Sequence, residues 1–149
     1  MGNRHRAPVL KRPCTRHGAI EGGILLVKRL ADCPAILAHD GCRLKELLHP
    51  GNDAVDIPYS LAVAVVDPGQ GTHPHRLEQT EVYHLLSGSG VMHIGGEERP
   101  VCAGDLVFIP AGETQWIENP GINPLVFAAI VSPPWRAQDD RRVESPGWD

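Results

Sequence analysis

Two histidines and a carboxylate lie close together between residues 71 and 88 and are of the types that bind metals. His73 and His75 form a His-x-His pair, and Glu81 follows within nine residues of the first imidazole. In an extended chain, side chains two residues apart point to the same face, so the imidazoles are expected to converge. Imidazole and carboxylate groups bind divalent Zn, Fe, Mn, Ni or Cu. The spacing predicts a metal centre, with a chance pair on an exposed loop as the alternative.

Apolar runs on both sides of this segment predict the strands that position it. Residues 60–66 form a continuous apolar run, which is typical of a strand buried on both faces. Residues 81–86 predict a second strand, in which Glu81 and Tyr83 share one face. Residues 91–94 are expected to pair with that strand as a hairpin across the glycines at 88–90.

The rest of the chain is predicted to form further short strands. The sequence contains 16 glycines and 14 prolines, which favours turns and β structure over a helix bundle. Residues 43–48 suit either a helical turn or a strand. The other predicted strands cover residues 24–27, 34–38, 99–102, 106–109, 114–119 and 125–131. Many short strands broken by Gly and Pro indicate a sandwich or barrel.

The length and charge of the chain limit the classes of protein to which it can belong. At 149 residues it is expected to hold one domain, which we place at 23–135. Residues 1–22 are basic and predict a flexible arm, and residues 136–149 predict a polar tail. The net charge of -4 argues against nucleic acid as a partner.

The cysteines and the hydropathy indicate the compartment. The four cysteines are widely spaced and contain no Cys-x-x-Cys pair, so a zinc ribbon or a thioredoxin-like site is not predicted. No apolar run is long enough to span a membrane, and no signal peptide is visible. A cytoplasmic protein with free thiols and no membrane partner is the expectation.

Two motifs in this sequence resemble those of the cupin superfamily. The first is His73-x-His75, then Glu81 and, after six residues, Gly88. The second is Gly104, five residues, Pro110-x-Gly112, two residues, Gln115, three residues and Asn119. The resemblance covers about residues 58–132 and implies an all-β fold, a cupin-type jelly-roll β-barrel, with the site inside it.

The resemblance also implies a ligand set for a divalent transition metal. His73 and His75 match the imidazoles of the first motif, and Glu81 matches its carboxylate. Glu81 lies one or two residues later than usual, so Glu78 or Gln79 is an alternative if the register differs. Gln115 stands where the family usually has a third histidine. It is expected to act as a weak ligand or as a hydrogen-bond donor to a ligand.

Two classes of function are compatible with this set. The first is a metalloenzyme, such as an isomerase or a dioxygenase, acting on a sugar, sugar phosphate or oxo-acid. The second is a non-catalytic small-molecule binder or sensor with weak or no metal binding, which the glutamine at 115 favours. A homodimer is expected by analogy with small cupins, formed through the strands predicted at 24–27 and 34–38.

Tyr83 and His93 are the remaining candidates for contact with a substrate. Tyr83 shares a strand face with Glu81, although packing is the commoner role for such a residue. His93 is a candidate acid or base if its side chain points inward. Trp116 is predicted to lie on the face opposite to Gln115 and so outside the barrel.

Overall fold

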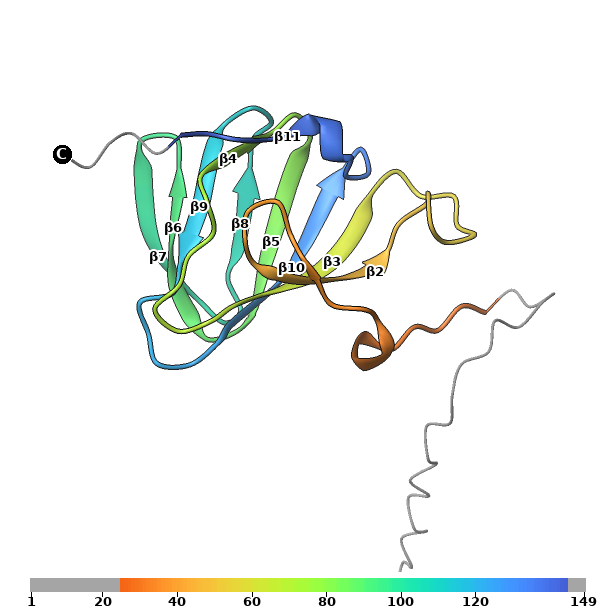
Figure 1. Cartoon of the computed structure of the whole chain (residues 1–149), viewed down its shortest axis with the longest axis horizontal. Coiled ribbons are helices and arrows are strands. Elements are labelled where there is room, and N and C mark those ends of the chain that lie inside the picture. The colour runs from red at the N-terminus through yellow and green to blue at the C-terminus, as the bar shows by residue number, and fades with distance from the viewer. Residues whose placement is uncertain (1–24, 145–149) are drawn as a thin grey trace, which may run out of the picture.

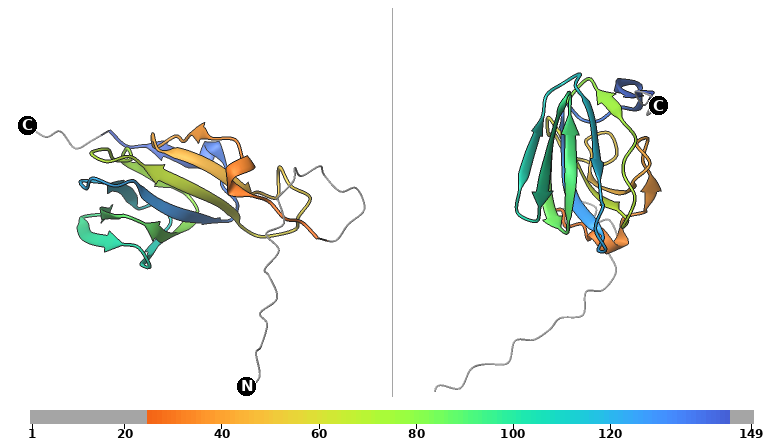
Figure 2. Two further views of the ribbon diagram at one scale, coloured as in Figure 1. Left: turned by 90° about the horizontal axis from the view of Figure 1, so that it is seen from below. Right: turned by 90° about the vertical axis from the view of Figure 1, so that its left-hand side faces the viewer.

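The chain folds into two antiparallel β-sheets that face each other as the walls of a flattened barrel (Figures 1 and 2). The structure is a computed structural model and describes residues 25–144. The strands are β1 (Ile36–Leu37), β2 (Arg43–Leu48), β3 (Ser60–Val66), β4 (His75–Leu77), β5 (Thr80–Ser87), β6 (Ser89–Ile94), β7 (Glu97–Cys102), β8 (Leu106–Ile109), β9 (Thr114–Glu118), β10 (Leu125–Ser132) and β11 (Asp140–Arg142). Two short 3-10 helices, η1 (Leu30–Asp32) and η2 (Ala137–Asp139), lie outside the sheets.

The order of the strands confirms the predicted jelly-roll barrel. One sheet has the order β1-β2-β3-β10-β5-β8, and the other has the order β11-β4-β9-β6-β7. Non-consecutive strands are therefore neighbours in both sheets, as the long connections of a jelly roll require. Residues 43–48, which the sequence left open, form strand β2 and not a helical turn.

Alternating side chains of both sheets fill the core between them. On β10, Leu125, Phe127 and Ala129 are buried in turn and pair with Val66, Ala64 and Ala62 of β3. From the facing sheet, Met92 of β6 and Ile117 of β9 belong to the same cluster. Full burial of a side chain such as Phe127 contributes roughly 2–3 kcal/mol. This packing fixes which residues of each strand point into the barrel.

Strands β5 and β6 do not form the predicted hairpin. β5 pairs with β8 and β10, whereas β6 pairs with β7 and β9 in the opposite sheet. The chain crosses between the sheets at Gly88, whose φ is 81° and where a Cβ would collide with the carbonyl oxygen of Pro124. A glycine turn between two apolar runs signals a reversal, but the sequence does not show whether the second run stays in the same sheet.

The C-terminal segment is part of the barrel. Residues 136–144 fall in the predicted polar tail, yet β11 pairs with β4 in the second sheet, and Val143 N donates to Pro74 O (2.9 Å). At the other end, residues 25–27 form no strand. Of the strand predicted at 34–38, the two residues of β1 are in a strand. The predicted basic arm at 1–22 lies outside the described residues.

In the described part of the chain, no helix is long and apolar enough to cross a membrane. Cys33, Cys42 and Cys102 are free thiols.

Candidate functional site

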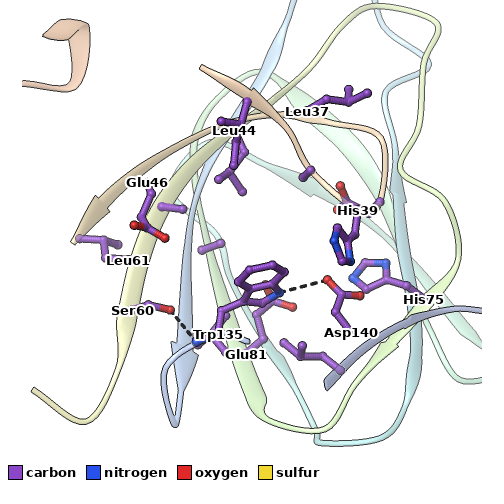
Figure 3. Close-up of a pocket in the computed structure, with 17 residues that line it drawn as sticks. Leu37, His39, Leu44, Glu46, Ser60, Leu61, His75, Glu81, Trp135 and Asp140 are labelled. Atoms are coloured by element: carbon purple, nitrogen blue, oxygen red, sulfur yellow. Dashed lines mark hydrogen bonds between the residues drawn. The ribbon is translucent and has the colours of Figure 1, made fainter. Parts of the chain in front are cut away.

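A cavity of about 260 Å³ lies between the β1–β2–β3 side of one sheet and the β4–β11 side of the other. His75, Glu81 and Asp140 line its polar side, and Leu44, Leu61, Leu77, Ala129, Val131 and Trp135 contribute apolar surface. Figure 3 shows the labelled side chains around this space. A concave, mainly apolar space with a few convergent polar groups is typical of a small-molecule site.

His75 presents one ring nitrogen to the cavity. It lies on β4 opposite Gln115 of β9 and is only 4% exposed. Its Nδ1 lies 2.9 Å from the carbonyl oxygen of His73. Because a carbonyl can only accept, Nδ1 carries a proton, and in the neutral form of the ring Nε2 then keeps its lone pair. An imidazole fixed in this tautomer can accept a hydrogen bond or bind a metal through Nε2.

Glu81 enters the same cavity from β5. Its Oε2 accepts a hydrogen bond from Gln115 Nε2 (2.7 Å), and the residue is 7% exposed. Burial raises the pKa of Glu81 to about 8; the carboxylates of Asp40 and Asp140 also raise it, against the hydrogen bond from Gln115, which lowers it. The carboxyl group therefore holds its proton near neutral pH when the cavity contains no cation. A protonated carboxyl and an imidazole that line one cavity are groups suited to acid–base chemistry.

Gln115 and Tyr83 are connected to Glu81 by a chain of hydrogen bonds. Tyr83 donates its hydroxyl hydrogen to Gln115 Oε1 (3.2 Å), while the amide nitrogen of Gln115 donates to Glu81. Tyr83 also packs on Phe127, with 4.2 Å between ring centroids. Neither Tyr83 nor Gln115 lines the cavity. Of the two roles predicted for Gln115, the geometry favours the hydrogen-bond donor, because its amide nitrogen donates to Glu81 and the residue does not line the cavity.

His73 does not line the cavity to which His75 contributes. It is exposed, its backbone nitrogen donates to Asp40 O (2.6 Å), and its ring lies against Gly41. The segment before β4 departs from a regular strand at Pro74, so the two-residue alternation that predicted convergence does not apply. Among residues 25–144, no three His, Cys, Asp or Glu side chains are grouped so as to hold a metal ion.

His93 points out of the barrel, so the condition set for its role as an acid or base is not met. Its ring stacks on Trp116 with 4.3 Å between centroids. Its Nε2 lies 3.1 Å from Glu118 and its Nδ1 lies 3.5 Å from Glu98. Trp116 lies on the outer face, as predicted, while Gln115 and Ile117 point inward.

The two alternatives to Glu81 have other partners. Glu78 is exposed and pairs with Arg141 (3.2 Å), and Gln79 donates a hydrogen bond to Asp139 (2.5 Å). Glu81 is thus the carboxylate of this segment that reaches the cavity.

Several cavity residues were missed from the sequence, among them His39, Trp135 and Asp140. Trp135 Nε1 donates to Asp140 Oδ2 (3.1 Å), and the rings of His39 and Trp135 meet edge to face at 5.4 Å. Trp135 and Asp140 belong to the segment taken for the end of the core and a tail. The sequence of this segment shows no strand pattern, because β11 has only three residues and lies at the edge of its sheet.

Comparison with known proteins identifies relatives of this chain. A family model for the cupin domain matches residues 62–131. An uncharacterized protein of Methanocaldococcus jannaschii is 36% identical over 110 residues, which is 72% of this chain and 86% of that protein. The oxalate-binding protein of Thermotoga maritima is 40% identical over 65 residues, which is 43% of this chain and 54% of that protein.

Solved structures share the fold. A predicted oxalate decarboxylase from Thermotoga maritima superposes with a TM-score of 0.64 at 29% identity, covering 72% of this chain and 98% of that one. The polyketide cyclase RemF from Streptomyces resistomycificus superposes with a TM-score of 0.68 at 21% identity, covering 80% and 86% of the two chains. The second likeness concerns the fold alone.

Proposed function

This chain belongs to the cupin superfamily, and we propose that it binds one small polar molecule in the cavity lined by His75 and Glu81. Cupin barrels carry many unrelated activities, so the proposal depends on the site and not on the fold. The observation that carries it is that the buried residues His75 and Glu81 line one cavity. Both groups are buried, and burial of polar groups that face a cavity is costly unless a ligand or water satisfies them.

The predicted four-ligand metal centre does not fit these residues. His73 lies outside the cavity, and the amide of Gln115 is used by Glu81 and Tyr83. That leaves His75 and Glu81 from the predicted set, fewer than the three protein ligands usual for a catalytic metal. We therefore base no reaction step on a metal.

A second candidate function is a divalent-metal site built on His75 and Glu81, and one observation favours it. The hydrogen bond from His75 Nδ1 to a backbone carbonyl is the orientation that metal-binding histidines commonly have. A bound cation would also stabilise the ionised form of Glu81.

One experiment tests the first proposal and separates it from the second. The purified protein is screened by thermal shift against sugars, sugar phosphates, oxo-acids including oxalate, and amines, with EDTA and separately with Mn²⁺ or Zn²⁺. We expect at least one compound to raise the Tm in EDTA, and His75→Ala and Glu81→Gln to abolish that shift. His93→Ala, which alters a histidine outside the barrel, is the matched control.

The outcomes are distinct. A shift that persists in both cavity variants would overturn the proposal, because the ligand would then bind elsewhere. A shift seen only with metal, together with transition metal in the purified protein that His75→Ala removes, would establish the second candidate instead.

A further inference from the structure

The cavity is lined by acidic side chains without basic partners. Of the described residues around it, four are carboxylates, two are histidines and none is lysine or arginine. The carboxylates are Asp40, Glu46, Glu81 and Asp140. The arginines of the adjoining segment have other partners: Arg136 pairs with Asp139, Arg141 with Glu78, and Arg142 Nε donates to His39 O. Such a cavity favours a ligand that brings positive charge.

Asp140 has one oxygen without a partner. Its Oδ2 accepts the indole hydrogen of Trp135, but its Oδ1 is buried and makes no hydrogen bond within the described residues. A buried acceptor of this kind is unusual and implies a donor from outside the chain. The position is also held firmly, because β11 pairs with β4 across Asp140 and Leu77.

Glu81 brings a second buried carboxyl group to the same space. The residue is 7% exposed, and its Oε2 accepts a hydrogen bond from Gln115 Nε2. Two carboxyl groups from different sheets thus face one cavity, as Figure 3 shows for the labelled Glu81 and Asp140. The ring of Trp135 lies beside them, and an indole face attracts cations as well as apolar groups.

We propose that the cavity selects a small molecule with a positively charged, hydrogen-bond-donating group, such as a primary amine, on an apolar body. Asp140 is then a specificity-determining residue that receives a hydrogen bond from that group, and Trp135, Leu61 and Leu77 contact the body. This inference rests on the proposed function, because it assumes that the ligand occupies this cavity. It also separates this chain from its oxalate-binding relative, since an oxalate dianion would meet four carboxyl-bearing side chains and no lysine or arginine among the described residues of this cavity.

The test uses three probes that share one apolar body and differ in the polar group: benzylamine, benzyl alcohol and benzoate. Binding to the full chain is measured in EDTA by ligand-observed NMR at millimolar probe concentration. We expect benzylamine to bind at least ten times more tightly than benzyl alcohol, and benzoate to show no binding.

The variant Asp140→Asn tests whether Asp140 determines the preference for the amine. Asparagine keeps an oxygen for the indole of Trp135, so the segment is expected to stay folded, but the negative charge is lost. The affinity for benzylamine should fall at least tenfold while that for benzyl alcohol changes less than threefold. Glu78→Gln is the control, because it makes the same chemical change on an exposed pair beside β11.

The possible results distinguish failure of this inference from failure of the proposed function. Benzoate or oxalate binding in EDTA as tightly as benzylamine, or benzylamine binding equally to Asp140→Asn, would overturn the inference and leave the small-molecule function standing. Binding of Mn²⁺ with no binding of benzylamine would overturn it in favour of a metal ion as the cation. If no compound of the wider screen binds with or without metal, the proposed function itself fails.

Discussion

Gln115 and Glu81 are joined by a buried hydrogen bond of 2.7 Å between β9 and β5, which lie in opposite sheets. The glutamine connects Glu81 to Tyr83, so three side chains form one polar chain across the barrel interior. Gln115 therefore acts on the site through Glu81. It holds the carboxyl group in place and does not itself line the cavity.

Replacement of Gln115 by leucine is expected to destabilise the protein. The change leaves the Glu81 carboxyl group and the Tyr83 hydroxyl without partners in the core, and each loss costs about 1–3 kcal/mol. Chemical denaturation should show the free energy of unfolding reduced by roughly that amount for each group. Gln138→Leu, at an exposed site, should change it little. Equal stability of wild type and Gln115→Leu would show that the polar chain is absent.

Stability is expected to fall as the pH rises from 4.5 toward 8. The pKa of Glu81 is raised from its ordinary value of 4.5 to about 8, chiefly by burial. Between these values the folded state keeps a proton that the unfolded state has released, so stability decreases with pH and levels off above 8. The Glu81 contribution is on the order of a few kcal/mol.

Comparison with Glu81→Gln isolates this contribution from other titrating groups. The difference in unfolding free energy between the two proteins should change across this pH window and be flat outside it. A constant difference between pH 4.5 and 8 would mean that Glu81 titrates normally, and hence that it is solvated in solution.

Gly88→Ala is expected to be strongly destabilising, because a Cβ there would collide with the Pro124 backbone at a residue with φ of 81°. Gly104 has a φ of 95°, and a Cβ added there would have no neighbour within 4 Å. Gly104→Ala therefore measures the cost of the positive φ without a steric clash. Strain of this kind costs about 1–2 kcal/mol, and a larger loss is expected at Gly88. Thermal denaturation of both variants gives the comparison. Equal losses would argue against the close approach that turns the chain from one sheet to the other.

The homodimer remains a proposal, and its apolar surface can be tested. Leu25, Leu26 and Val27 are all more than half exposed, as is Ile36 on the edge strand β1. Light scattering of the wild type is expected to give twice the mass of the chain, and Leu26→Glu should reduce it to the monomer. Leu106→Glu, on the opposite edge of the same sheet, is the control. A monomeric wild type at working concentration would contradict the proposal.

Much of the fold could be predicted because it follows from local pattern. Alternation along 114–118 and the apolar runs at 60–66 and 125–131 require strands whatever their partners. The partners themselves were harder to predict. The β5–β6 pairing was wrong because a glycine turn has the same sequence signal whether the chain doubles back or changes sheet.

The site was predictable only where a regular strand carries the residue. Glu81 and Gln115 lie on β5 and β9, and their inward direction follows from alternation. His73 precedes β4 and follows no such rule. Asp140 was missed because a three-residue edge strand held by tertiary contacts has no periodicity of its own.

The most direct test of the account is a long-range ¹H–¹⁵N spectrum of the histidine rings, recorded before and after addition of the compound that gives the largest thermal shift. We predict that His75 starts as the Nδ1-protonated tautomer and that its Nε2 resonance moves on binding, while His93 on the outer face stays unchanged. An unmoved His75 resonance at saturation would contradict the claim that this cavity is the binding site.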